Sequence, residues 1–267
     1  MENSLKKNNN SNISSEVITS GAERIAKVIA RSGLCSRREA ERWIFEGKVK
    51  LNNKILTECG TKVTSNDLIE VNGYPLPSKT ITKLWLYHKQ RGYLVTNNDP
   101  DGRLTIFDQL KVKNQSRFIS IGRLDMDSEG LLLLTNDGDL ARKLELPSTG
   151  WLRKYRVRVH GYVNSKELES LKNGITIDGI RYGSIDATLD RQQGSNAWLT
   201  LGLREGKNRE IRKVMSHLGY NVNRLIRISF GPFNLKNLPS GELEQVKQRV
   251  LNDQLGITKS KKQNKIK

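Results

Sequence analysis

The sequence has few cysteines, few histidines and no long apolar segment, and each shortage argues against a class of protein. Cys35 and Cys59 are its only cysteines, and they form no C-x-x-C motif. We therefore expect two reduced, partly buried thiols in a cytoplasmic protein rather than a disulfide. The three histidines lie far apart in the sequence, which argues against a zinc site. The longest clear apolar run, Leu131–Leu134, is far shorter than the roughly 18–20 residues that cross a bilayer.

The sequence also argues against a secretory leader and a nucleotide-binding loop. The first twelve residues read MENSLKKNNNSN and have no apolar core, which argues against a signal peptide. No G-x-x-x-x-G-K-[S/T] motif occurs, so the sequence gives no support for ATP binding. We expect a protein that uses no metal, no nucleotide and no redox cofactor.

What the sequence has in excess is positive charge. It carries 46 Lys and Arg against 28 Asp and Glu, a net charge of +18 over 267 residues. At about 150 residues per domain, this length suggests two domains. A surface this basic attracts polyanions at long range, so nucleic acid is the first candidate partner and an anionic membrane surface the second.

Composition and patterning divide the chain into five segments. Residues 1–22 are rich in Asn and Ser without periodicity, and residues 252–267 end in a Lys-rich stretch, so both are expected to be disordered tails. Between them we predict a small domain at residues 23–73 and a turn-rich linker at 74–82. A larger domain is predicted at residues 83–251.

The small domain shows two helices followed by short strands. Apolar residues at helical spacing predict a first helix that ends near Gly33. Ser36 and Glu39 have the spacing of a capping box and begin a second helix, which ends at Gly47. Asn52-Asn53 separates two short apolar strands, as expected for a tight hairpin, and Asp67–Val71 is expected to be a further strand.

Basic residues lie mostly on these two helices, and most charge runs of this kind are simply solvated faces. The order Arg24-x-x-Lys27, then Gly33-Leu34-Cys35-Ser36-Arg37-Arg38-x-Ala40, then Gly47-x-Val49-x-Leu51-Asn52 is more specific, and it resembles the S4 RNA-binding domain. The resemblance implies that the module binds RNA. The candidate RNA-binding residues are Arg24, Lys27, Arg37, Arg38, Arg42 and Lys48.

Short strands dominate the larger domain, with helical patterns near Asp139–Leu144 and Glu210–Leu218. The parallel β-α-β alternation of nucleotide-binding folds is missing. The predicted class is therefore α+β, a small S4-like α/β module followed by a larger, mainly antiparallel sheet domain. The expected strands are Leu84–Tyr87, Gly92–Val95, Phe118–Ile121, Leu131–Leu134, Lys154–Val159 and Trp198–Leu203.

The most informative segment is residues 121–138, IGRLDMDSEGLLLLTNDG, an acidic, Gly-containing loop between two apolar strands. Its first acidic residues imitate an EF-hand calcium loop. Such a loop needs a bidentate Glu at its twelfth position and a helix after it, whereas here Asn136 follows a Leu-rich strand. We therefore exclude calcium. Carboxylates on a loop of this kind are placed where a substrate can reach them.

The same segment resembles the active-site motif of the RsuA-type ribosomal RNA pseudouridine synthases. Three further motifs agree with this resemblance, which covers roughly residues 24–250: Asn98-Asp99-Pro100-Asp101-Gly102-Arg103, Leu152-Arg153-Lys154-Tyr155-Arg156-Val157, and Glu205-Gly206-Lys207-Asn208-Arg209-Glu210-Ile211-Arg212-Lys213-Val214-Met215. One departure is visible. Relatives often have Asn-Lys-Pro before a Gly, where this chain has His88-Lys89-Gln90-Arg91-Gly92, which changes the stiffness of a turn.

The family resemblance implies roles for four residues. Asp125 would be the essential aspartate that converts uridine to pseudouridine, as nucleophile or as base. A carboxylate covered by RNA needs a nearby cation to stay ionised, and Arg212 is the family's candidate, although an isolated Arg is more often exposed on a helix face. Tyr155 would stack on the target uracil, although most such tyrosines are core residues. Arg123 would hold the displaced nucleotide or fill its space.

The sequence leaves two other functions open. The chain could be a non-catalytic S4-type RNA-binding protein used in ribosome assembly, although binding alone would not require Asp125, Tyr155 and Arg212 together. It could also be a glycosidic hydrolase, but the sequence shows no separate acid beside Asp125 and Asp127. The preferred hypothesis is a cytoplasmic, monomeric enzyme that modifies ribosomal RNA or a pre-ribosomal particle, with the 23S RNA favoured by the Lys-Tyr strand.

Overall fold

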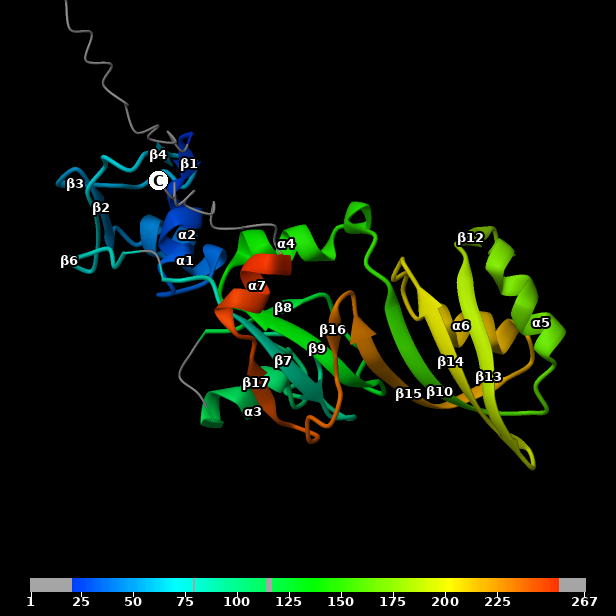
Figure 1. Cartoon of the computed structure of the whole chain (residues 1–267). Coiled ribbons are helices and arrows are strands. Elements are labelled where there is room, and N and C mark those ends of the chain that lie inside the picture. Colours follow the sequence, from blue (N-terminus) through cyan, green and yellow to red (C-terminus); the bar gives the residue numbers. More distant parts are fainter. Residues whose placement is uncertain (1–20, 79, 114–116, 255–267) are drawn as a thin grey trace, which may run out of the picture. The chain divides into compact units, whose positions relative to one another are not determined.

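The computed structural model describes residues 21–78, 80–113 and 117–254, and it divides into two compact units, Met1–Thr80 and Ile81–Lys267 (Figure 1). Most of the two predicted tails, residues 1–20 and 255–267, lies outside the described residues. The described part of the chain contains no helix that is long and apolar enough to span a membrane.

The first unit packs two short helices against small strands. Its elements are β1 (Glu23–Arg24), α1 (Ile25–Arg31), α2 (Arg37–Phe45), β2 (Val49–Leu51), β3 (Lys54–Ile55), β4 (Lys62–Val63), β5 (Ile69–Val71) and β6 (Tyr74–Pro75). Four of the strands form a sheet in the order β3-β2-β5-β6, and β1 pairs with β4. Apolar residues at helical spacing bury one side of each helix, and Ile25, Ile29, Ala40 and Ile44 are all fully buried in one core.

Of two local predictions for this unit, the tight turn is confirmed and the capping box is confirmed in part. Asn52 and Asn53 both have positive φ, at 48° and 68°, as the two-residue turn between β2 and β3 requires. Ser36 is the N-cap of α2, and its hydroxyl accepts a hydrogen bond from the Glu39 backbone N–H at 3.1 Å. The Glu39 carboxylate pairs with Arg42 instead of returning to Ser36, so only one half of the capping box forms.

The second unit is built on a nine-stranded sheet with the main order β13-β14-β10-β15-β9-β7-β17. Every pairing in it is antiparallel except that between β15 and β9. The predicted α+β class, with a small module before a larger and mainly antiparallel sheet, is confirmed. The sheet strands are β7 (Leu84–Lys89), β8 (Ile119–Ile121), β9 (Glu129–Thr135), β10 (Arg153–His160), β13 (Ile185–Gln193), β14 (Asn196–Leu203), β15 (Asn221–Phe230), β16 (Phe233–Asn234) and β17 (Leu243–Gln245).

Helices and a small hairpin complete this unit. They are α3 (Ile106–Lys113), α4 (Gly138–Glu145), α5 (Ser165–Ser170), α6 (Glu210–His217), α7 (Gln248–Gln254), two 3₁₀ turns (Pro147–Thr149 and Leu171–Asn173), and the hairpin β11 (Ile175–Ile177) with β12 (Ile180–Tyr182). The two faces of the sheet bury two separate cores. In β9, Leu132 and Leu134 belong to one core and Leu131 and Leu133 to the other, which explains the uninterrupted Leu run.

Three sequence expectations differ from the structure. Gly92–Val95 is not a strand but a turn with a single bridge from Leu94 to Thr105, because Gly92 takes a φ of +91°. The linker expected at 74–82 begins too early, since Tyr74–Pro75 forms β6 against β5 and Leu76 packs on the first core. Residues 252–254 of the expected basic tail belong to α7, because the buried Leu251 anchors this helix to the second unit.

Candidate active site

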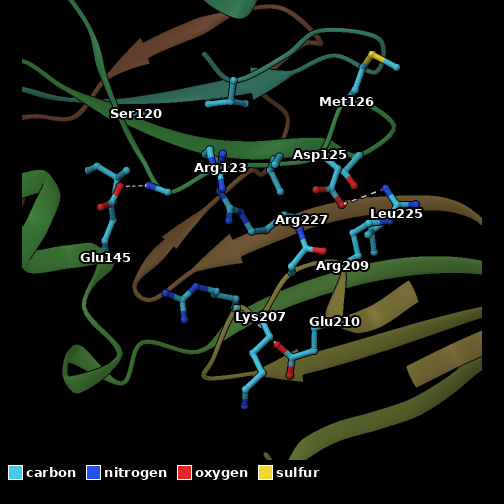
Figure 2. A pocket seen from close by; sticks show the side chains of 18 of the residues that line it. Ser120, Arg123, Asp125, Met126, Glu145, Lys207, Arg209, Glu210, Leu225 and Arg227 are labelled. Carbon is cyan, nitrogen blue, oxygen red and sulfur yellow. Dashed lines mark hydrogen bonds and ion pairs between the residues drawn. The ribbon is translucent and has the colours of Figure 1, made fainter. Parts of the chain in front are cut away.

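A cleft of about 1050 Å³ opens in the second unit beside the loop that joins β8 to β9. Its walls come from this loop, the segment 94–103, the end of α4 with Pro147, neighbouring residues of β10 and β15, and residues 203–211, which lead into α6 (Figure 2). Seven basic and five acidic side chains line it, namely Arg103, Arg123, Arg153, Arg204, Lys207, Arg209 and Arg227, with Asp99, Asp125, Glu145, Glu205 and Glu210. The motif that sequence analysis singled out therefore lies at a basic cleft.

The β8–β9 loop, residues 122–128, is held by backbone contacts on both sides. The Gly122 N–H donates to the Glu145 carboxylate at 2.5 Å, at the end of α4. The Gly92 N–H donates to the Met126 carbonyl at 2.7 Å, and the loop closes on itself when Ser128 N–H donates to the Asp125 carbonyl at 3.0 Å. These bonds fix the backbone from which Asp125 projects, so its carboxylate does not depend on a flexible loop for its position.

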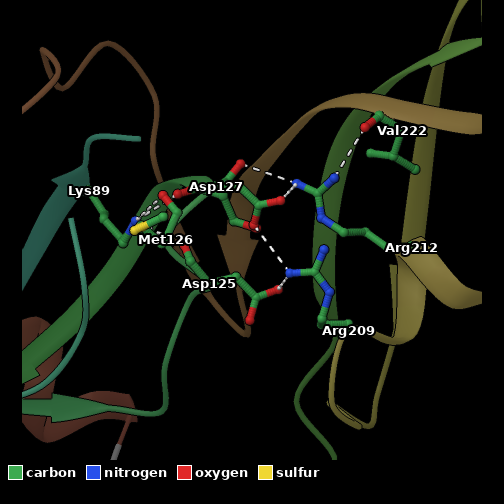
Figure 3. Close-up of polar contacts among 8 residues, drawn as sticks. Lys89, Asp125, Met126, Asp127, Arg209, Arg212 and Val222 are labelled. Carbon is green, nitrogen blue, oxygen red and sulfur yellow. Dashed lines mark hydrogen bonds and ion pairs between the residues drawn. The ribbon is translucent and has the colours of Figure 1, made fainter. Parts of the chain in front are cut away.

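Lys89 lies beneath this loop and is fully buried. Its Nζ donates to four carbonyl oxygens, those of Ser128 at 2.8 Å, Asp125 at 3.0 Å, Gln90 at 3.0 Å and Met126 at 3.4 Å (Figure 3). Burial lowers the pKa of the ammonium to about 8, while the nearby carboxylates of Asp127 and Asp125 oppose that shift. Sequence reasoning missed this role, although Lys89 lies in the segment where the missing proline was noted.

Gly130 allows β9 to approach β15 where the loop ends. Its φ is +104°, and a Cβ there would overlap the Arg227 carbonyl oxygen and lie 2.7 Å from the Arg227 backbone nitrogen. The parallel pair of β9 with β15 places Gly130 directly opposite Arg227. Only a residue without a side chain fits this contact, which explains the glycine in the acidic motif.

Two arginines before and within α6 reach the acidic loop from the opposite wall (Figure 3). Arg209 Nη1 lies 3.8 Å from the Asp125 carboxylate and 3.5 Å from that of Asp127. Arg212 Nη2 lies 3.1 Å from the Asp127 carboxylate and donates to the Asp127 carbonyl, while its Nη1 donates to the Val222 carbonyl. Burial lowers the pKa of Arg212, and the charge of Asp127 opposes this.

Sequence analysis expected Arg212 to pair with Asp125. In the structure Arg212 pairs with Asp127, and Arg209 is the arginine that reaches Asp125. Arg209 is the N-cap of α6 and has a φ of 50°, which directs its side chain across the cleft toward Asp125. Arg212 lies nearly one turn further into the helix and meets Asp127 instead. The Asp125 carboxylate faces the cleft, whereas Asp127 is not part of the cleft lining.

Tyr155 lies on β10, is only 8 % exposed and lines the cleft. Its direct neighbours across the sheet are Leu201 on β14 and Arg227 on β15. Arg123, by contrast, is an exposed residue of the β8–β9 loop at the same cleft. The structure therefore brings Asp125, Tyr155 and Arg123 together around one space, and leaves Arg212 behind the loop.

Several charged residues of the cleft escaped sequence analysis. Glu210 is 3 % exposed, and its Oε2 accepts a hydrogen bond from the Lys207 backbone N–H at 2.9 Å. Burial, and secondarily the charge of Glu205, raises the pKa of Glu210 to about 7. Arg227 is equally buried, on the inward face of β15. For Arg227 the sequence offered a signal, namely a charged residue at an inward-facing position of a strand whose apolar residues alternate.

The six basic residues proposed to bind RNA lie on or beside α1 and α2. Some also form ion pairs within the unit: Lys27 with Glu23 at 2.8 Å, Lys48 with Glu46 at 2.6 Å, and Arg42 with Glu39. Arg24, Arg37 and Arg38 are exposed. Their role in binding RNA stays a prediction. Among the described residues, no group of three or more His, Cys, Asp or Glu side chains could hold a metal ion.

Comparison with known proteins agrees with this geometry. The family described as RNA pseudouridylate synthase matches residues 83–217, and the S4 domain matches residues 23–69. A protein of Rickettsia felis named an uncharacterized RNA pseudouridine synthase is 44 % identical over 229 residues, which cover 86 % of this chain and 99 % of the relative.

A second relative carries a more specific name. Ribosomal large subunit pseudouridine synthase B of Pseudomonas aeruginosa is 38 % identical over 244 residues, 88 % of this chain and 63 % of that protein. A solved structure described as a pseudouridylate synthase superposes with a TM-score of 0.58 at 25 % identity, over 86 % of this chain and 98 % of that one. The family resemblance drawn from the motifs is confirmed.

Proposed function

This chain belongs to the RNA pseudouridylate synthase family and is an RNA pseudouridine synthase, and on that premise we propose that it isomerises a uridine of ribosomal RNA, in the large-subunit (23S) RNA, with Asp125 as the essential carboxylate. The observation that supports this proposal most directly is that the Asp125 side chain lines the cleft, with the Arg209 guanidinium 3.8 Å away. Because the chain is an enzyme of this family, the non-catalytic alternative is set aside.

The reaction breaks the C1′–N1 bond of uridine, turns the uracil, and joins C1′ to C5. The proton that leaves C5 balances the one that N1 gains, so the product is an isomer and no co-reactant is needed. An ionised Asp125 can attack as a nucleophile or remove a proton. Arg209 contributes positive charge beside it, although at 3.8 Å and partly exposed the pair is worth only about 0–1 kcal/mol before RNA covers it.

The walls of the cleft suit an everted nucleotide. Its volume, about 1050 Å³, is at the upper end of the roughly 300–1,000 Å³ of small-molecule sites, so it has room for more than one base. Tyr155 offers an aromatic surface for the target uracil, and Leu225 is a second apolar lining residue. Arg123 at the exposed side would occupy the space that the flipped nucleotide leaves in the RNA.

The first unit would deliver the RNA to this cleft. Its exposed arginines, together with the net charge of +18, favour phosphate contacts that do not depend on sequence. Replacing both Arg24 and Arg38 by Gln is expected to weaken binding to ribosomal RNA and to reduce the slope of log K against log salt by about 0.7–0.9 for each phosphate that is no longer bound. Lys54→Gln, an exposed change on β3, is the matched control. A slope that does not differ from that of the wild type would exclude Arg24 and Arg38 from phosphate binding.

The central test replaces Asp125 by Asn and assays pseudouridine formation in ribosomal RNA from cells that lack the gene. We expect no product, while RNA affinity stays within a few-fold of wild type. Asp127→Asn is the matched control. It removes the same negative charge from a neighbouring residue that does not line the cleft, and it should retain measurable activity. Turnover by the Asp125 variant at the normal rate would show that this carboxylate is not essential.

The identity of the RNA is tested by mapping pseudouridines in ribosomal RNA from cells with and without the gene. We expect the loss of modification at a site in the 23S RNA. Loss confined to the small-subunit RNA would contradict the large-subunit assignment and leave the activity itself intact.

A further inference from the structure

Two arginine side chains share one aromatic ring inside the cleft. Arg153 on β10 has its Cζ 4.7 Å from the centroid of the Phe230 ring, and Arg227 on β15 has its Cζ 5.2 Å from the same centroid. All three residues line the cleft. Neither the family comparison nor the proposed chemistry at Asp125 gives these two guanidinium groups a role.

The charge of Arg227 is poorly compensated. Its Nε donates to the Leu131 carbonyl at 2.7 Å, but its Nη2 is buried and has no hydrogen-bond partner. The residue is 3 % exposed, and it takes part in none of the ion pairs formed among the described residues. Withdrawing a guanidinium from water without an anionic partner is unfavourable, so the fold maintains this arrangement at the expense of stability.

Arg153 has the same character. Its Nη1 donates to the carbonyls of Arg204 at 2.6 Å and Trp151 at 3.4 Å, both of them neutral acceptors. Burial lowers its pKa and the charge of Arg227 lowers it further, while Tyr155 and Glu210 act in the opposite direction. Two like charges are therefore held near one another, and an anion bound between them would relieve both desolvation and repulsion.

On this basis we propose that Arg153 and Arg227 form a phosphate subsite that binds a backbone phosphodiester of the RNA beside the target uridine. The proposal rests on the proposed function, because it requires RNA in the cleft. A guanidinium presents a planar set of donors that matches phosphate oxygens, and the free Nη2 of Arg227 is one such donor. Arg227 lies directly opposite Tyr155 across the sheet, so a nucleotide stacked on that ring carries its phosphate close to this pair.

The test measures binding of an in vitro transcript of the large-subunit ribosomal RNA at several salt concentrations. Arg227→Met and Arg153→Met are each expected to reduce the slope of log K against log salt by about 0.7–0.9, the value for one phosphate contact. Arg227→Lys retains the charge and should retain the wild-type slope. Arg153 is only half-buried, so its variant also provides a reading that does not depend on the core.

Arg156→Met is the matched control. Arg156 lies on the same strand as Arg153 and covers an aromatic ring, that of Trp198, at 5.0 Å, but it is exposed and outside the cleft lining. The Arg156→Met variant should have the same slope of log K against log salt as the wild type. Equal slopes for wild type, Arg227→Met and Arg153→Met would overturn the subsite, as would weaker binding with an unchanged slope, which indicates a contact to an uncharged base.

The same preparations are assayed for pseudouridine formation, so that the two proposals fail separately. A wild-type protein that modifies ribosomal RNA but shows no slope change in the variants refutes the phosphate subsite and leaves the function standing. A wild-type protein that modifies no ribosomal RNA refutes the proposed function, and the subsite with it.

Discussion

Arg212 holds Asp127 twice, with its Nη2 3.1 Å from both the carboxylate and the backbone carbonyl of that residue. This contact ties α6 to the β8–β9 loop across 85 residues of sequence. Asp125 lies two residues earlier in the same loop, so the anchor fixes the catalytic candidate without touching it. We therefore regard Arg212 as a positioning residue.

The anchor predicts non-additive effects. Arg212→Met and Asp127→Asn are each expected to lower the rate of pseudouridine formation by about ten- to one-hundredfold, because the Asp125 backbone loses its support. The double variant should lower the rate by less than the product of the two single effects, since both changes remove the ion pair between Arg212 and Asp127. The measurement is single-turnover kinetics with ribosomal RNA. Fully multiplicative decreases in rate would show that the two residues act independently.

Gly130→Ala tests the close approach of β9 to β15. The added Cβ would overlap the Arg227 carbonyl at a backbone φ of +104°, so we expect the free energy of unfolding to fall by about 3 kcal/mol or more. Gly122→Ala is the control, because Gly122 also has a positive φ, of +71°, but a Cβ there meets nothing within 4 Å. It should cost only about 1 kcal/mol. A similar destabilisation of the two variants in denaturant unfolding would contradict the steric argument.

Glu210 predicts a pH-dependent stability. Burial raises the pKa of Glu210 from 4.5 to about 7, so the folded protein binds one more proton than the unfolded chain between these values. The stability that this proton contributes is fully present below about pH 4.5 and is lost as pH rises through 7. Glu210→Gln imitates the protonated form. It should match the wild type near pH 5 and exceed its free energy of unfolding by on the order of 2 kcal/mol at pH 8.

Glu205→Gln is the matched comparison for that experiment. Burial acts to raise the pKa of Glu205, but the Gly183 N–H and the Lys207 ammonium outweigh it and lower the pKa. This residue therefore stabilises the fold in its ionised form, and its Gln variant should be less stable than wild type at pH 8. Denaturant titrations at the two pH values separate the predictions. A Glu210 variant that is equally destabilised at both would show that its carboxyl is ionised in the folded protein.

Local patterns predicted local structure well. The Ser36 cap, the Asn52-Asn53 turn and the helices near 139–144 and 210–218 depend on contacts between residues a few positions apart, and each was found where expected. The strand β15 was missed, because Arg224 and Arg227 interrupt its apolar alternation. Its inward arginine is stable only because Leu131, 96 residues away, supplies a carbonyl and Phe230 supplies a ring.

The amino-acid sequence by itself determined the class of fold, the two-part organisation, the family and the acidic loop that carries Asp125. These follow from composition, periodicity and motifs of adjacent residues. Only the tertiary structure decided which arginine meets which carboxylate, that Lys89 lies beneath the loop, and that Arg153 and Arg227 share Phe230. Such contacts depend on the strand order β10-β15-β9 and on its register, which long-range pairing sets and no short stretch of sequence encodes.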